Sequence, residues 1–113
     1  MPTRHANPGE FIDVGPLGPR LSEMNTEAFL KEEGLEVIRL ILPQGKNIPT
    51  HHAPGPITVH CLEGRIEFTA MGVTRELKAG QMLYLLGKEP HSLHALEASS
   101  VLVTLRLPSD ANA

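Results

Sequence analysis

Two stretches of the chain decide its fold: residues 43–64, PQGKNIPTHHAPGPITVHCLEG, and residues 80–95, GQMLYLLGKEPHSLHA. Each stretch joins a short apolar run to glycines and prolines, and each carries histidines beside those breaks. Short apolar runs that are bounded by turn residues are typical of β-strands with at least one buried face. The two stretches therefore predict strands over residues 57–63 and 82–86, with tight turns on either side.

Turn residues recur in the same way along the whole chain, which has 113 residues with ten glycines and ten prolines. That length suits one domain. Strands are predicted over 35–42, 57–63, 65–70, 73–77, 82–86, 91–96 and 101–107. Turn signals that recur about every 8 to 12 residues favour an all-β sandwich or barrel. We expect an N-terminal arm or strand over 1–14 and a barrel over 15–113, with its core over 35–107.

Two of these strands are apolar at nearly every position, which predicts burial on both faces. They cover residues 35–42 and 82–86. A single barrel can cover only one face of each strand, so the other needs a partner surface. We therefore expect a homodimer. The apolar segment over residues 11–14 could add a strand to its own sheet or to that of the partner.

Composition excludes several classes of function. The formal net charge is −3 and no block of basic residues is present, so nucleic-acid binding has no electrostatic support. No apolar run is long enough for a membrane span or a signal peptide. The single Cys61 excludes an internal disulfide and fits a reducing compartment. We expect a cytoplasmic protein that binds neither membranes nor nucleic acids.

Five residues repeat the spacing of two known motifs, G-x5-H-x-H-x3-E-x6-G and G-x5-P-x-G-x2-H-x3-N: Gly45, His51, Gly64, Gly80 and His91. On this spacing the chain resembles a small single-domain cupin of the RmlC-like type. The resemblance implies a jelly-roll β-barrel, also called a double-stranded β-helix. Where the family has its second His and its Glu, this chain has Ala53 and Ile57. Leu86, Lys88 and Ala95 also depart from the second motif.

The resemblance implies that His51 and His91 point into the barrel as ligands of a divalent metal such as iron, manganese, nickel or zinc. Ala53 and Ile57 offer no lone pair. Two imidazoles and water make a weak site, and the loss of the carboxylate weakens charge compensation. The alternative is that both histidines are polar residues at the barrel mouth, bonded to backbone or water.

The alternation of side chains along a strand predicts which way three other histidines point. His52 follows His51 directly, and His60 lies three residues after Ile57, so alternation turns both outward. The same reasoning turns His94 outward. A bulge over residues 53–56 would change this parity, and bulges are frequent beside sites. His60 and His52 therefore stay as further candidate ligands.

Four residues are expected to line the pocket: Ala53, Ile57, Val59 and Tyr84. Tyr84 could form a proton-transfer pair with His91, as in metal-free sugar epimerases of the resembled fold. Its place within an apolar run favours a core tyrosine with its hydroxyl at the rim.

Three classes of function follow from these residues. We favour the binding of a small organic molecule in the barrel, with or without a divalent metal, because the expected pocket holds few catalytic polar groups. The alternatives are a metal-dependent enzyme of dioxygenase type and a metal-free isomerase or epimerase that uses histidine as acid or base. Whether the chain is an enzyme stays open, because fold alone does not choose among these classes.

Overall fold

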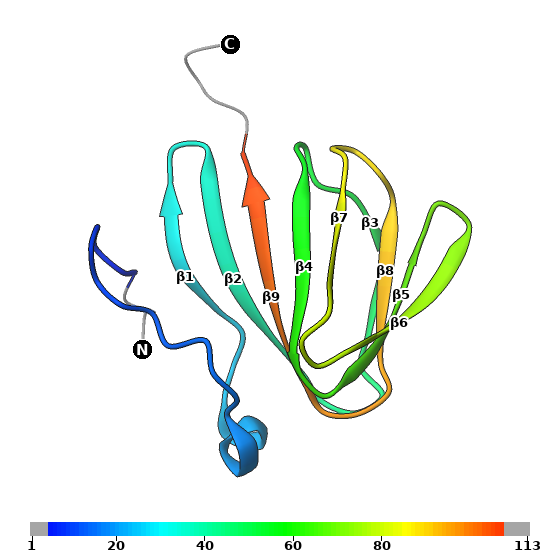
Figure 1. Cartoon of the computed structure of the whole chain (residues 1–113). Coiled ribbons are helices and arrows are strands. Elements are labelled where there is room, and N and C mark those ends of the chain that lie inside the picture. The colour runs from blue at the N-terminus through cyan, green and yellow to red at the C-terminus, as the bar shows by residue number, and fades with distance from the viewer. Residues whose placement is uncertain (1–4, 108–113) are drawn as a thin grey trace.

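The computed structural model describes residues 5–107, and its regular structure is almost entirely β (Figure 1). The only helical element in this part of the chain is a short 3-10 helix, η1 (Gly18–Glu23). The strands are β1 (Glu27–Glu32), β2 (Leu35–Leu42), β3 (Asn47–His51), β4 (Ile57–Glu63), β5 (Arg65–Ala70), β6 (Val73–Lys78), β7 (Met82–Leu85), β8 (His91–Ala95) and β9 (Ser99–Arg106). Across residues 5–107, no helix combines the length and the apolar character that crossing a membrane requires. The predicted all-β class is confirmed.

The strands form two antiparallel sheets. One has the order β1-β2-β9-β4-β7 and the other the order β3-β8-β5-β6. Apart from the hairpins β1–β2 and β5–β6, consecutive strands lie in opposite sheets, which is the connectivity of a jelly roll. Figure 1 shows the β4–β5 and β8–β9 turns at one end and the β3–β4 and β7–β8 connections at the other.

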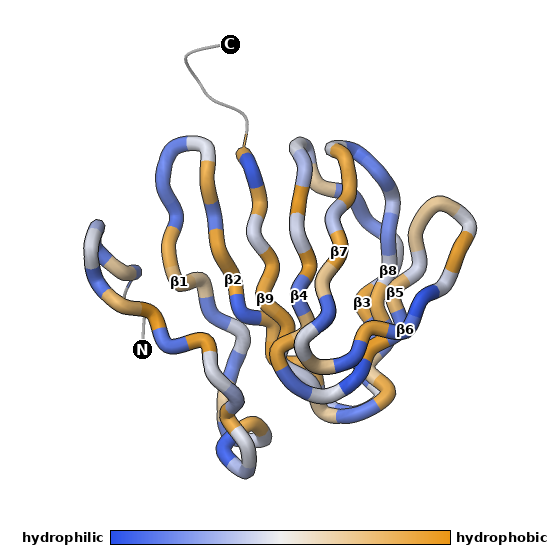
Figure 2. Tube along the Cα trace, viewed as in Figure 1, coloured by the Kyte–Doolittle hydropathy of each residue, from blue (hydrophilic) through white to orange (hydrophobic). Residues whose placement is uncertain are grey.

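Alternation along the strands builds the core between the two sheets. Polar and apolar residues alternate along much of the chain in Figure 2. On β4 the inward positions Ile57, Val59 and Cys61 are all buried, as the sequence predicts. They join a cluster of buried side chains from both sheets: Leu42, Ile57, Val59, Cys61, Ile66, Phe68, Leu77, Leu85, Leu93, Ala95 and Val101.

The seven predicted strands are confirmed to within about two residues at their ends, and the structure adds β1 and β3 to them. The strand β3 contains Pro49. Proline is tolerated because β3 is an edge strand, where one side of the backbone needs no partner. Within the single chain the outer face of β7 is uncovered, since Met82 and Tyr84 are 57% and 69% exposed.

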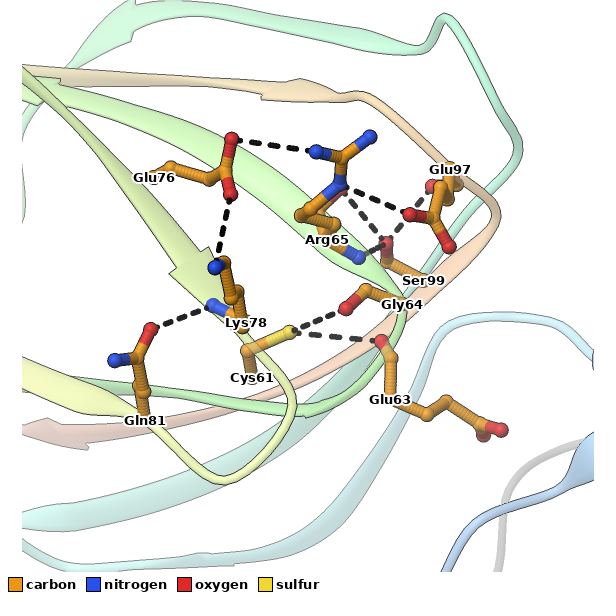
Figure 3. Close-up of polar contacts among 9 residues, drawn as sticks. All are labelled: Cys61, Glu63, Gly64, Arg65, Glu76, Lys78, Gln81, Glu97 and Ser99. Carbon is orange, nitrogen blue, oxygen red and sulfur yellow. Dashed lines mark hydrogen bonds and ion pairs between the residues drawn. The ribbon is translucent and has the colours of Figure 1, made fainter.

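A polar network joins the turns at the β4–β5 end of the barrel (Figure 3). The backbone N–H of Arg65 donates to Ser99 Oγ at 2.9 Å, and the Ser99 hydroxyl lies 2.8 Å from the Glu97 carbonyl oxygen. The Arg65 guanidinium also pairs with the Glu97 carboxylate at 2.9 Å. Gly64 has φ +85°, and a Cβ there would lie 2.3 Å from Ser99 Oγ. The network therefore depends on a glycine at this turn.

The N-terminal segment packs on the outside of the five-stranded sheet. The Arg39 side chain is buried under it and donates to the carbonyl oxygen of Asp13 at 3.1 Å. The Glu63 carboxylate accepts a hydrogen bond from the N–H of Leu17 at 2.7 Å. Within the single chain, residues 11–14 form no strand. The part of the 1–14 segment that the structure describes is held by the Arg39 side chain and by the N–H of Ala6, which donates to the carbonyl oxygen of Phe29 at 2.8 Å, rather than by a sheet ladder.

Candidate functional site

The structure brings His51 and His91 together. His51 ends β3 and His91 begins β8, and the two residues are Cα partners in the ladder between these strands. Their ring centroids lie 4.3 Å apart with an interplanar angle of 62°. Two sequence segments that are forty residues apart thus supply one pair of imidazoles at the same end of the barrel.

The backbone fixes the tautomer of both rings. His51 Nδ1 lies 2.9 Å from the carbonyl oxygen of Pro49, and His91 Nδ1 lies 2.9 Å from that of Glu89. A carbonyl oxygen only accepts hydrogen bonds, so each Nδ1 carries the proton. In the neutral ring Nε2 then keeps its lone pair for a metal or for a hydrogen-bond donor. Ligating histidines are held by the same kind of bond.

His91 is held in its neutral form by its surroundings. It is 5% exposed and stacks on Phe68 with the ring centroids 5.5 Å apart. Burial lowers the pKa of His91, and the nearby His51 and His52 lower it further, while the hydrogen bond to Glu89 opposes part of the shift. At neutral pH the Nε2 atom of His91 is therefore an acceptor.

The two histidines face a cavity of about 440 Å³ between the sheets. Pockets for small organic molecules measure about 300–1,000 Å³. Four polar residues line it: Glu36, His51, His52 and His91. The other lining residues are apolar: Ile38, Leu40, Ile48, Ala53, Pro54, Ile57, Val59, Phe68, Leu93, Val103, Leu105 and Leu107. The site is an apolar chamber with a few polar groups.

Three of the four expected pocket residues line this cavity, namely Ala53, Ile57 and Val59. Tyr84 does not, and its expected place in the pocket is corrected. It is 69% exposed and lies opposite Thr58 in the β4–β7 ladder. Alternation along β7 turns its neighbours inward and its own ring outward. Tyr84 is therefore no proton-transfer partner of His91 within the cavity.

The other histidines divide between inside and outside. His52 lines the cavity, although alternation predicts that it faces away. The strand ends at His51 after a register shift in its ladder, so the period of two no longer applies. His60 lies away from the cavity, opposite Met82 in the β4–β7 ladder. His94 is also outside, with its Nδ1 2.5 Å from Asn47 Oδ1.

Glu36 was not predicted to belong to the site. It shares the inward side of β2 with Ile38 and Leu40, which line the same cavity. Alternation counted back from Leu42, which is buried, would have found it. The strand is mostly apolar, so its one inward acidic residue was not recognised as part of the site.

A complete metal centre is not formed by the described residues, which include no group of three or more His, Cys, Asp or Glu side chains that could hold an ion. The donors that the structure brings into contact are the two imidazoles of His51 and His91. Zinc and iron sites in proteins commonly use at least three protein ligands. The donor set of this chain therefore fits a resident metal only in part.

Comparisons with known proteins place the fold. The family model described as the cupin domain matches residues 38–105. A conserved protein of unknown function from Streptococcus pyogenes is 22% identical, with TM-score 0.74 and 96% of each chain covered. A cupin superfamily protein from Desulfitobacterium hafniense is 14% identical, with TM-score 0.75, 94% of this chain and 100% of that chain covered.

A third structure, KdgF from a Halomonas species, is 18% identical, with TM-score 0.68, and covers 78% of this chain and 82% of that chain. No curated protein matches the sequence. At these identities the structural likeness shows the fold alone.

Proposed function

As this chain belongs to the cupin family, we propose that it binds a small organic molecule in the barrel cavity, with a polar group of the ligand held by Nε2 of His51 and His91. The observation that carries the proposal is the pairing of these two imidazoles with an apolar chamber of about 440 Å³. A few fixed polar groups within a mostly apolar concave wall are the usual composition of a ligand site.

Apolar contact would supply most of the affinity. Burial of apolar surface is worth roughly 25 cal/mol per Å². The histidine pair would then set the orientation, because each ring is fixed by a hydrogen bond from Nδ1 to a backbone carbonyl. Such preorganisation lowers the cost of ordering the site when the ligand binds.

A divalent ion of iron, manganese, nickel or zinc is a secondary part of the proposal. His51 and His91 would hold it through Nε2, and it would supply a positive charge that polarises an oxygen of the ligand. Water and the ligand would have to complete the coordination, since the described residues offer no third donor in place.

The enzymatic alternatives have less support. A dioxygenase needs a firmly held metal, for which the donor set is incomplete. An isomerase needs an acid–base pair, and Tyr84 lies outside the cavity. Glu36 lines the cavity, but no hydrogen bond or ion pair of the described residues joins it to His51 or His91.

The test uses phenylnaphthylamine, a neutral fluorescent probe with one N–H donor. The protein should bind one probe per chain. Val103→Phe should abolish binding because Val103 lines the cavity. Leu102→Phe is the matched control, since Leu102 is the next residue on the same strand and does not line the cavity. Binding that survives in Val103→Phe, or no binding by the intact protein, would overturn the proposal.

We also propose that two copies of the chain form a dimer. Met82, Tyr84 and Leu86 are 57%, 69% and 72% exposed on or beside the edge strand β7. A two-fold contact would cover this apolar surface. Light scattering should report a dimer at micromolar concentration, and Tyr84→Glu should shift it to a monomer. A monomer of the intact chain would exclude the dimer.

Cys61 supports a proposed location in the cytoplasm. Its side chain is fully buried, and burial raises the pKa of the thiol, so it acts as a small apolar core residue. A chain with one thiol gains no disulfide from an oxidising compartment. Cell fractionation that finds the protein outside the cytoplasm would contradict this assignment.

A further inference from the structure

Among the polar residues that face the cavity, Glu36 carries the only carboxylate, beside the imidazoles of His51, His52 and His91. Glu36 is an acceptor only, and a neutral imidazole with its Nδ1 proton committed offers Nε2 as an acceptor. The Nδ1 atoms of His51 and His91 donate to backbone carbonyls. No lysine or arginine lines the cavity. The chamber thus has no fixed cation with which to receive an anionic ligand.

Glu36 lies where it can meet one end of a ligand. It is the second residue of β2, two residues after the Gly34 turn, and it precedes Ile38 and Leu40 along the inward side. It is half-buried, and its carboxylate forms no hydrogen bond or ion pair with the described residues. Lys31 is its cross-strand Cα partner but is exposed and forms no ion pair with it.

The apolar surroundings strengthen the attraction between the Glu36 carboxylate and a cationic group. Twelve of the sixteen lining residues are apolar, and attraction between opposite charges increases where water is excluded. An ammonium group would supply the donors that the carboxylate lacks. A carboxylate or phosphate would instead meet a like charge and the lone pairs of the imidazoles.

We propose that the ligand is a small amine with an apolar body, whose ammonium group pairs with Glu36 at one end of the cavity while the body lies against the apolar wall. The inference rests on the proposed function and specifies its ligand class. An anionic ligand would meet the like charge of the Glu36 carboxylate and should bind more weakly.

The experiment compares three probes that share a benzene ring and a short chain: phenethylamine, phenethyl alcohol and phenylacetate. Each is titrated against protein that carries bound phenylnaphthylamine, and displacement gives the affinity. A hydrogen bond to a charged group should favour the amine over the alcohol by about tenfold or more. Phenylacetate should bind more weakly than the alcohol.

Two variants locate the effect. Glu36→Gln keeps the size of the side chain and should abolish the preference for the amine over the alcohol. Glu67→Gln is the matched control, because Glu67 lies on β5 outside the cavity, and it should keep the preference.

The outcomes separate the two proposals. If phenylnaphthylamine binds but phenylacetate equals or exceeds phenethylamine, the amine inference is overturned and the proposed function stands. The inference also fails if none of the three probes displaces phenylnaphthylamine, or if Glu36→Gln keeps the preference. If phenylnaphthylamine itself does not bind, the proposed function fails first.

Discussion

Replacing Gly64 by alanine should destabilise the barrel far more than the same change at Gly72. Both glycines have positive φ, +85° and +75°, so both replacements place a Cβ in the left-handed region. A Cβ at Gly64 would lie 2.3 Å from Ser99 Oγ and 2.4 Å from the carbonyl oxygen of Ala98. A Cβ at Gly72 would have no heavy atom within 4 Å. The pair therefore separates backbone strain from steric contact.

The magnitudes follow from these two terms. The left-handed conformation costs an L-residue about 1–2 kcal/mol, and this cost applies to both variants. Forcing extra volume into a packed region typically costs another 1–3 kcal/mol or so. We expect Gly72→Ala to lose about 1–2 kcal/mol of unfolding free energy and Gly64→Ala about 2–5 kcal/mol. The carbonyl of Ala98 belongs to the backbone, so the contact cannot be relieved by a side-chain rotation alone.

Urea unfolding followed by far-ultraviolet circular dichroism measures both values, since the chain has no tryptophan. The slope of unfolding free energy against urea should be the same in both variants and in the parent chain. Equal losses for Gly64→Ala and Gly72→Ala would refute the reasoning, because the close contact at the β4–β5 turn would then have no energetic consequence.

Three further predictions concern the site. Because the pKa of His91 is lowered in the folded chain, its contribution to stability is present above pH 6.5 and is lost as pH falls through the folded pKa. Chemical unfolding at a series of pH values should show this, with a smaller fall in His91→Phe; an unchanged pH profile would contradict it. Ala53→His combined with Ile57→Glu adds two donors beside the histidine pair, so nickel or zinc should raise the melting temperature of the double variant more than that of the parent; equal shifts would show that the added donors do not reach the ion. Lys88 has φ +68° at a motif position where the family has glycine, so Lys88→Gly should raise the free energy of unfolding by about 0.5–1 kcal/mol, and a loss in urea unfolding would contradict this.

Much of the fold could be predicted because turn residues and period-two alternation are local signals. The strands over 35–42, 57–63 and 65–70 are observed with these bounds. The strand β3 could not be predicted from local signals, because its proline and polar residues give no apolar run. Its pairing with β8 is a long-range contact. The exposure of Tyr84 could not be predicted for another reason. An apolar run does not show which face of the strand is covered, or whether a second chain covers the other face.

The site was only partly accessible from the sequence. Motif spacing led to His51 and His91, whose rings the structure places side by side. Alternation alone turns His52 outward, but it was kept as a further candidate, and it lines the cavity because alternation ends where the strand ends, here at residue 51. Glu36 was missed because it lies outside both motifs, and only the inward side of β2 brings it to the cavity.

The most direct test of ligand binding at the histidine pair is a long-range proton–nitrogen NMR spectrum that resolves the imidazole nitrogens, recorded while phenylnaphthylamine is added. A hydrogen bond or an ordered ligand at Nε2 changes the chemical shift of that nitrogen. The Nε2 resonances of His51 and His91 should move in a saturable manner, while those of His60 and His94, which lie outside the cavity, should stay in place. Unchanged resonances of His51 and His91 at saturation, or equal movement of all four histidines, would contradict the proposed site.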